Sequence, residues 1–284
     1  MSNILFGLGR QNIGNKAINF SSDTLKASLL SMSTTAGKIY TLSAASNATP
    51  IVVTMSATTG ITAGDILVVG GVGGNTAANG TWVAGTVTGT TVQLLTRLDS
   101  GNSTGNAAYT SGGWMIDISS ASTLSDVSGN SIGTDVSLSG VTNTLGVINA
   151  SGFTWTSLTA TKAWAIAIYD STAANDLVAF LDGTYQLYVI TQQAAASTSI
   201  AVARLSVVIP SGTVIVFSDG TTATTTAQNA IGDTSLAVSS TAAIIHRQAT
   251  ADCATLQCGL PVTPAAGGNM SFTVDTNANK LFAI

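Results

Sequence analysis

AWAIAIYDSTAANDLVAFLD, which spans residues 163–182, carries the clearest structural pattern in the chain. Two apolar runs, Ala163–Tyr169 and Val178–Leu181, enclose a short segment of small and polar residues. Runs of this length between turn-forming residues are typical of buried strands. Asp170 and Asp176 stand where the chain is expected to turn, because Asp side chains hydrogen-bond to nearby backbone in turns. The stretch therefore predicts two strands and a hairpin.

The same pattern recurs along the whole chain. Short apolar or alternating segments are separated by Gly, Asn, Asp and Ser, and helical periodicity is nearly absent. Asn79-Gly80 and Asp219-Gly220 are predicted hairpin turns, because such pairs adopt positive φ at low cost. The predicted fold class is all-β, with further strands at Ala17–Phe20, Leu25–Leu30, Ile51–Met55, Ile66–Val69, Thr81–Val87, Thr91–Leu95, Thr213–Phe217, Ser235–Val238, Met270–Val274 and Lys280–Ile284.

Charged residues are scarce in this sequence. Only 8% of the 284 residues are charged, against about 25% in an ordinary soluble domain. The acidic residues are thirteen Asp and no Glu, and the chain is rich in Thr and Val, which favour strands. Evenly spread large apolar residues argue against disorder. We interpret the surface as one that packs against other subunits; the alternative is a secreted β protein with a polar, uncharged coat.

Several functional classes are disfavoured by charge and hydropathy. The net charge is −4, and no run of Lys or Arg provides the footprint of a nucleic-acid-binding protein. The sequence contains no apolar stretch of about 18 or more residues, so it predicts no membrane span. The N-terminal MSNILFGLGRQNIGNKAINF lacks the features of a signal peptide, so we expect synthesis in the cytoplasm and solubility until assembly.

Two stretches have the composition of insertions. Residues 46–113 are rich in Gly, Thr and Val, and residues 186–250 are rich in Ala, Ser and Thr. The remaining segments, 1–45, 114–185 and 251–284, would form one discontinuous base, because insertions leave their host at loop tips. The sequence thus predicts a discontinuous β-sandwich base domain with two inserted small β domains.

The second insertion contains an internal repeat. The first copy is QQAAASTSIAVARLSVVIPSGTVIVF (Gln192–Phe217), and the second is TAQNAIGDTSLAVSSTAAII (Thr226–Ile245). In both copies an Ala-rich segment precedes the pattern S-I/L-A-V. This pattern indicates two copies of a β unit of about 34 residues. Two copies are few for a solenoid, so a small barrel or sandwich is favoured.

Three base segments carry a family resemblance. INFSSDTLKASLL (Ile18–Leu30), followed by IYTL (Ile39–Leu42), is similar to the start of a family of small structural proteins of tailed bacteriophages, with Phe20 in place of a Trp. Leu138–Gly183 resembles the family's middle segment, and GLPVTPAAGGNMSFTVDTNANKLFAI (Gly259–Ile284) closely resembles its end. The segments keep the family order and cover about half of the chain. The resemblance implies a component of the phage particle.

The chain departs from the family pattern in two places. The family's Asp before T-F is replaced near Ser151–Phe153, and the final segment is separated by the second insertion. The first insertion, at Thr59–Val87 and Tyr109–Trp114, resembles a β module of phage structural proteins. That module is similar to a small β domain of ubiquitin-activating enzymes, with Thr59 in place of its usual His. The resemblance implies packing or binding.

Candidate reactive groups are few. Asp170, Asp176 and Asp182 could form a carboxylate cluster, but turn capping is favoured. DTNAN (Asp275–Asn279) lacks the Gly and the distal Glu of a calcium loop. GGVGGN (Gly70–Asn75) is not followed by Lys-Ser/Thr or a helix, so we expect a flexible loop and not a phosphate site.

The cysteines and the histidine point to no definite site. Cys253 and Cys258 are expected to be plain thiols or, as the alternative, a disulfide, and a metal site is disfavoured because too few ligands surround them. His246 is the only histidine, with no nucleophile evident nearby, so a surface or packing role is expected.

Large aromatic and basic residues have structural interpretations. The tryptophans are expected to anchor cores, with stacking on sugars as the alternative; they are Trp82, Trp114, Trp155 and Trp164. Scattered lysines are expected to be solvated or to pair with Asp across subunits, namely Lys26, Lys38, Lys162 and Lys280.

These observations predict a non-enzymatic virion structural protein without catalytic, cofactor-binding or metal-binding residues. The favoured interpretation is a capsid decoration (cement) protein on the capsid surface, whose partners are the major capsid protein and neighbouring virion subunits. Association into homo-oligomers, with a trimer as the expectation, follows from the interpretation of the surface. The alternatives are a tail or fibre component that recognises the host and, third, an enzyme such as a glycan depolymerase.

Overall fold

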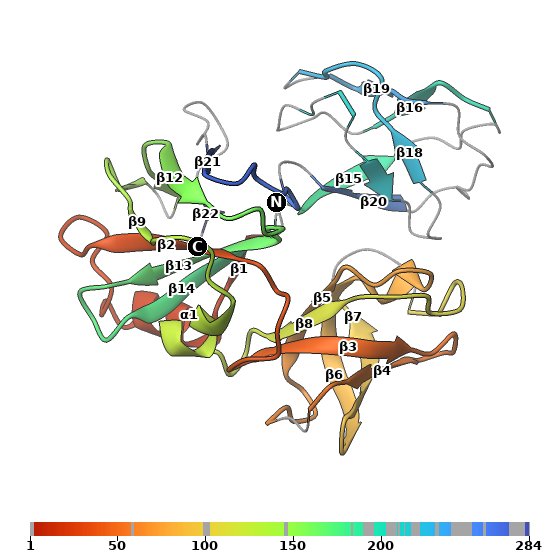
Figure 1. The fold of residues 1–284 in the computed structure, drawn as a ribbon, viewed down its shortest axis with the longest axis horizontal. Coiled ribbons are helices and arrows are strands. Elements are labelled where there is room, and N and C mark those ends of the chain that lie inside the picture. The colour runs from red at the N-terminus through yellow and green to blue at the C-terminus, as the bar shows by residue number, and fades with distance from the viewer. Residues whose placement is uncertain are drawn as a thin grey trace.

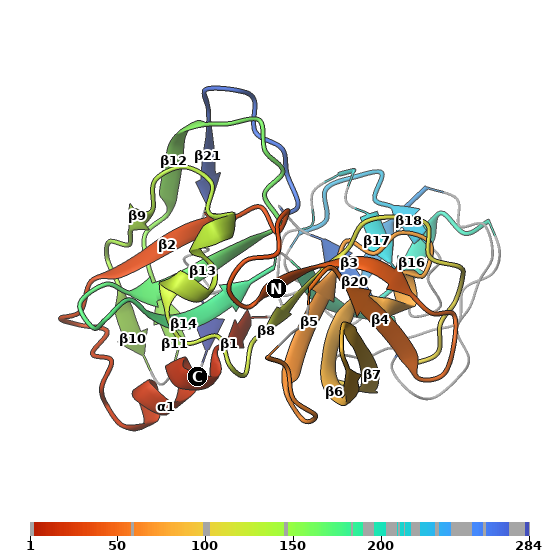
Figure 2. The same ribbon diagram turned by 60° about the horizontal axis from the view of Figure 1, so that its bottom comes forward.

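The computed structural model describes residues 3–57, 60–98, 103–144, 147–182, 184–189, 196–202, 209, 211–212, 214–216, 222–230, 233–239, 252–257, 260–272 and 282–283. It is mostly β, with 46% strand and a single α-helix within those residues. This confirms the predicted β character. Three groups of strands can be distinguished in Figures 1 and 2: a sheet with a second layer, a closed barrel, and a third group from the later part of the chain.

A five-stranded antiparallel sheet is built around the hairpin at residues 163–182. Its order is β1-β14-β13-β2-β9, and β13 and β14 pair so that Asp170 lies opposite Asp176. The predicted hairpin is therefore confirmed. The bounds of its strands are β1 (Asn3–Leu5), β2 (Leu25–Leu30), β9 (Val136–Ser137), β13 (Ala165–Asp170) and β14 (Asp176–Leu181).

Both faces of this sheet are covered. Every residue of β13 is buried, and alternate side chains enter different cores. Ile166 and Ile168 belong to one core, whereas Ala165, Ala167 and Tyr169 belong to the other. A strand buried on both faces explains why this segment reads as a continuous apolar run.

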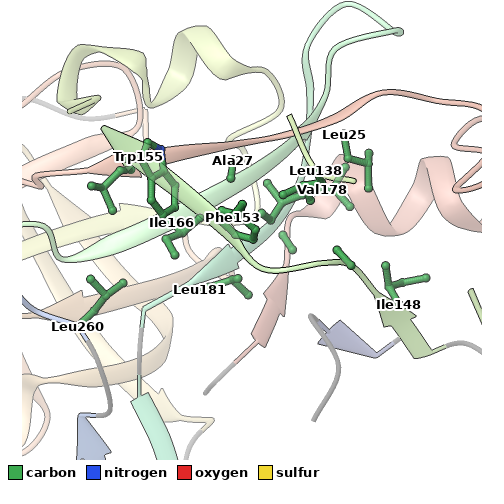
Figure 3. Packing of buried hydrophobic residues seen from close by; sticks show 14 of the residues in the cluster. Leu25, Ala27, Leu138, Ile148, Phe153, Trp155, Ile166, Val178, Leu181 and Leu260 are labelled. Carbon is green, nitrogen blue, oxygen red and sulfur yellow. The ribbon is translucent and has the colours of Figure 1, made fainter. Parts of the chain in front are cut away.

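The first core lies between the sheet and a second layer of short strands. Phe153 and Trp155 project from β12 toward Ile166 of β13, and Figure 3 shows these side chains together. The rings of Phe153 and Trp155 meet edge to face with centroids 5.2 Å apart. The second layer consists of β10 (Thr142–Thr144), β11 (Val147–Asn149) and β22 (Phe282–Ala283), with β12 (Phe153–Leu158) and β21 (Gly268–Phe272) as a separate pair.

A closed antiparallel barrel contains the second core. Trp82 is fully buried in it, and the indole N–H donates to the carbonyl oxygen of Ala78 at 2.8 Å. The barrel order is β3-β4-β7-β6-β5-β8. The bounds are β3 (Ile39–Ala45), β4 (Ile51–Met55), β5 (Ile66–Gly70), β6 (Gly80–Thr88), β7 (Thr91–Arg97) and β8 (Trp114–Asp117). The barrel thus extends beyond residues 46–113 at both ends, because β3 and β8 close it.

A third core joins the barrel to the other face of the five-stranded sheet. Trp114 of β8 lies edge to face with Phe180 of β14 at 6.2 Å and with Trp164 at 6.0 Å. Gly70 at the end of β5 allows this approach, because a Cβ atom there would stand 2.3 Å from the Trp114 ring. Barrel and sheet therefore share buried apolar surface.

The third group contains a four-stranded sheet and a separate strand pair. The sheet order is β15-β20-β17-β18, formed by β15 (Thr184–Val189), β20 (Asp252–Gln257), β17 (Val214–Val216) and β18 (Thr222–Thr224). β17 and β18 are antiparallel, as the predicted turn between them requires, although Asp219-Gly220 lies outside the described residues. β15 and β20 lie at and beyond the ends of the range 186–250.

The two copies of the internal repeat pair with each other. β16 (Ser199–Ala201) and β19 (Ser235–Ala237) are antiparallel, with Ile200 opposite Leu236. The amide of Val202 donates to Thr234, and that of Val238 donates to Thr198, both at 2.9 Å. Equivalent residues of the two copies thus exchange equivalent bonds across a local twofold axis.

Three local predictions are wrong. Ala17–Phe20 is irregular and not a strand, because it leads from a helix into β2. That helix, α1 (Gly7–Gly14), was not predicted; it packs on β14, where Gly9 would place a Cβ 2.6 Å from the Val178 carbonyl oxygen. Asn79-Gly80 is no hairpin turn, since Gly80 already begins β6. The 3-10 helices are η1 (Thr76–Ala78), η2 (Leu124–Asp126) and η3 (Ser128–Asn130).

Candidate functional site

The three predicted aspartates occupy structural positions around the β13–β14 hairpin. Asp170 accepts a hydrogen bond from the backbone N–H of Thr172 at 2.8 Å, which caps the turn as predicted. Asp176 accepts from the side-chain amide of Asn12 at 2.7 Å and so ties α1 to the sheet. Asp182 is buried just after β14. Asp170 and Asp176 are therefore engaged in holding backbone elements together.

Asp170 has an unusual environment for a carboxyl group. Its residue is fully buried, and its Oδ2 atom has no hydrogen-bond partner among the described residues. Burial raises the pKa of Asp170, and the nearby charge of Asp23 raises it further, while the bond from Thr172 opposes the shift. A buried, partly unsatisfied carboxyl group favours its neutral form.

A second group of ionisable residues lies where the barrel meets η2. The carboxyl group of Asp117 accepts from the amides of Ser119 and Ser120, at 3.0 and 3.1 Å, and from the Ser120 hydroxyl. Burial raises the pKa of Asp117, and the positive charge of Lys38 lowers it. Burial also raises the pKa of Tyr40. The hydrogen bonds identify Asp117 as a loop cap.

The glycine-rich segment Gly70–Asn75 packs against neighbouring parts of the barrel. Asn75 is fully buried, and its amide donates to the Ser46 carbonyl oxygen at 2.8 Å. Asn79 closes the same loop, donating to Val72 O at 3.1 Å and accepting from Val72 N at 2.9 Å. The glycines allow backbone to approach aromatic rings and other backbone.

The tryptophans lie in the cores, as predicted. Trp82, Trp114 and Trp155 are buried, one in each core. Trp164 is partly buried against the third core, and the Lys162 ammonium lies 4.0 Å from its ring centroid. Lys162 therefore makes a cation–π contact within the chain.

Several predicted residues lie outside the described part of the chain. They are His246, Cys258, Lys280 and Asp275–Asn279; Cys253 belongs to β20, but its side chain is not described. Within the described residues, no group of three or more His, Cys, Asp or Glu could hold a metal ion. In the same part of the chain, no helix is long and apolar enough to cross a membrane.

A pocket opens at the rim of the first core. It has a volume of about 570 Å³ and lies between the loop that follows α1 and the start of β10. Ile18 and Phe20 are buried in the core below it, and Val141 packs against the same core. Its lining residues are Lys16, Ile18, Asn19, Phe20, Ser21, Val141, Thr142 and Asn143.

Hydrogen bonds fix the loop on one side of this pocket. Asn19 Oδ1 accepts from the N–H and the hydroxyl of Ser21, at 3.1 and 2.7 Å. Asp23 accepts from the backbone N–H of Asn19 at 2.6 Å and from the Ser22 hydroxyl at 3.1 Å. Lys16 lies just after the C-cap of α1 with φ +58°, and its N–H donates to the Ile13 carbonyl oxygen at 3.1 Å.

Sequence reasoning did not identify this pocket. The two walls are far apart in the sequence, and the residues of the first wall were predicted as a strand. The left-handed backbone conformation of Lys16 is not predictable from the sequence, because Gly or Asn normally occupies that position after a helix. The pocket therefore depends on tertiary structure.

Comparisons with protein-family models, with curated proteins and with solved structures found no match to this chain.

Proposed function

We propose that this protein is a non-catalytic structural component of a tailed-bacteriophage virion, located on the capsid surface as a decoration (cement) protein. The support from the sequence is the likeness of Ile18–Leu30, Leu138–Gly183 and Gly259–Ile284 to phage structural proteins. The observation that carries the proposal is a surface on which hydroxyl groups largely replace charges.

Exposed and half-buried hydroxyl groups of this protein bond to one another. Thr35, Thr41 and Ser56 form a triangle with oxygen–oxygen distances of 2.9, 2.6 and 2.6 Å. Thr154 and Ser271 make a similar 2.8 Å bond across the β12–β21 pair. Burying such groups in an interface avoids the desolvation cost of burying charges. A surface of this kind is suited to permanent contact with neighbouring subunits.

Multiplicity would turn modest contacts into a strong association. A standard interface buries about 800 Å² per partner, and linked contacts on a symmetric shell act with a high effective concentration. In this proposal, the sheet and its second layer form a discontinuous sandwich base that binds the major capsid protein. The barrel and the third group are insertions that extend to neighbouring subunits, and the copies associate, with a trimer as the working assumption.

A second candidate function is supported by a separate observation. The pocket beside Lys16 has the size of a small-molecule site. A tail or fibre component that contacts the host would use such a pocket for recognition. The particle location decides between the two candidates.

The test is rebinding to capsids that lack the protein. Purified protein is mixed with expanded capsids of the virus that encodes it, and bound copies are counted by quantitative gel analysis after sedimentation. We expect saturation at a copy number comparable to the major shell protein. Binding should change less than about twofold between 0.1 and 1 M NaCl, because few charges contribute. Saturation at a few copies at one vertex or on the tail contradicts the proposal.

A further inference from the structure

The pocket beside Lys16 combines a cation, hydrogen-bonding groups and an apolar floor. We propose that it binds a carboxylate-bearing sugar, such as a uronic acid unit of a glycan. This inference does not depend on the proposed place of the protein in a particle.

The charge of the pocket favours an anionic ligand. Among the lining residues, Lys16 contributes one cation and no residue contributes a carboxylate, although the protein as a whole carries a net charge of −4. The nearest carboxylate of the loop belongs to Asp23, and both of its oxygens accept hydrogen bonds from the loop itself. A ligand carboxylate can therefore pair with the exposed Lys16 ammonium, and charge-assisted bonds of this kind are stronger than neutral ones.

The polar lining suits hydroxyl groups of a sugar ring. The Oδ1 atom of Asn19 accepts two hydrogen bonds from Ser21, so the Nδ2 group of Asn19 can act as a donor to a ligand. The hydroxyls of Ser21 and Thr142 can accept from ligand hydroxyls. Below them, Phe20 and Val141 provide an apolar floor for the C–H face of a ring.

The backbone of Lys16 adopts the left-handed conformation, as do five other non-glycine residues in the described part of the chain. A non-Gly residue with φ +58° costs roughly 1 kcal/mol relative to an ordinary conformation. Glycine would fill this position after α1 without strain. The favourable effect of a cation at a helix C-terminus accounts for part of the preference for Lys.

The pocket volume sets the size of the ligand. About 570 Å³ lies within the ~300–1,000 Å³ range of small-molecule sites and accommodates one or two sugar rings. Since the polar lining residues are exposed to water, we expect a Kd on the order of 1 mM for a single uronic acid.

The test uses a matched pair of sugars and a variant that should not harm the fold. Glucuronate and glucose differ by the carboxylate, and both are titrated into the isotopically labelled full chain while amide NMR shifts are recorded. We expect glucuronate to shift amides of residues 16–21 and 141–143, and glucose to bind at least about tenfold more weakly. Equal binding of both sugars, or shifts elsewhere in the chain, would overturn the proposal.

Lys16→Gly removes the ammonium and also relieves the left-handed strain, so loss of binding cannot be ascribed to misfolding. We expect its Tm to be equal to or above that of the wild type, and its glucuronate affinity to fall at least about tenfold. Lys162→Gln is the control, because it also removes one positive charge, but beside Trp164 and not in the pocket lining. This variant should bind glucuronate as the wild type does. Undiminished binding by Lys16→Gly, or equally strong binding of glutarate, would refute the sugar assignment. Because these titrations use the isolated protein, their failure leaves the capsid rebinding result unaffected.

Discussion

Replacing Gly70 by Ala tests how closely β5 packs against Trp114, the barrel residue whose ring contacts the five-stranded sheet. A Cβ atom at this position would lie 2.3, 2.7 and 2.9 Å from the ring atoms Cζ2, Cε2 and Cη2 of Trp114. The ring has little room to retreat, because it packs edge to face against Trp164 and Phe180. Gly70 is not in the left-handed region, so the backbone itself tolerates alanine.

The expected cost is that of overpacking a buried contact, about 1–3 kcal/mol of unfolding free energy. Trp114→Phe should relieve much of this cost. All three clashing atoms belong to the six-membered ring of the indole, and the phenyl ring of Phe lies closer to its own backbone than that ring does. Trp114 Nε1 is buried without a hydrogen-bond partner among the described residues, so its removal sacrifices no hydrogen bond there and offsets part of the lost packing. The double variant should therefore be more stable than additivity predicts, by about 1 kcal/mol or more.

Urea denaturation followed by far-UV circular dichroism measures the four proteins of this double-mutant cycle. Gly14→Ala is the control, because a Cβ there meets nothing within 4 Å; its stability should be equal to or slightly above that of the wild type. If the effects of Gly70→Ala and Trp114→Phe add within about 0.5 kcal/mol, Gly70 and Trp114 are not in the close contact described.

Two further predictions concern the five-stranded sheet. Asp170→Asn should stabilise the protein by about 1 kcal/mol at pH 7, because a neutral amide avoids the cost of burying a charged carboxylate whose Oδ2 has no hydrogen-bond partner among the described residues. The pKa of Asp170 is raised in the folded state, so the folded wild type holds this proton more tightly than the unfolded chain does. The contribution of Asp170 to the stability of the wild type therefore falls as the pH rises above the ordinary pKa of 3.8. The advantage of the variant should therefore shrink toward pH 3, and an advantage independent of pH in thermal unfolding would contradict this. Gly9→Ala should cost about 1–3 kcal/mol in urea denaturation, because its Cβ would lie 2.6 Å from the Val178 carbonyl oxygen; a neutral effect would show that α1 does not pack as described.

The strand cores were predictable because their signal is local. Leu25–Leu30 and Ile51–Met55 agree with β2 and β4 residue for residue, and the β13–β14 hairpin follows from apolar runs around a polar turn. These segments bury most of their side chains, so their composition reflects their environment.

The errors arise where tertiary contacts override local preference. α1 contains three glycines and little apolar periodicity, and it is held by Asn12 and by the close approach of Gly9 to β14. Asn79-Gly80 has the sequence of a hairpin turn, but the Asn79 side chain instead closes the loop onto Val72. The pocket could not be predicted at all, since Val141–Asn143 meets the loop after α1 only in the folded chain.

The central claim is that this chain is a repeated part of a viral particle. Its most direct test is a particle map of the encoding virus in which the protein carries a visible label, combined with quantitative mass spectrometry of the purified particles. The account predicts regular density over the outer shell and a copy number comparable to the major shell protein. Particles that lack the protein, or that carry it only on the tail or at one vertex, would contradict the account.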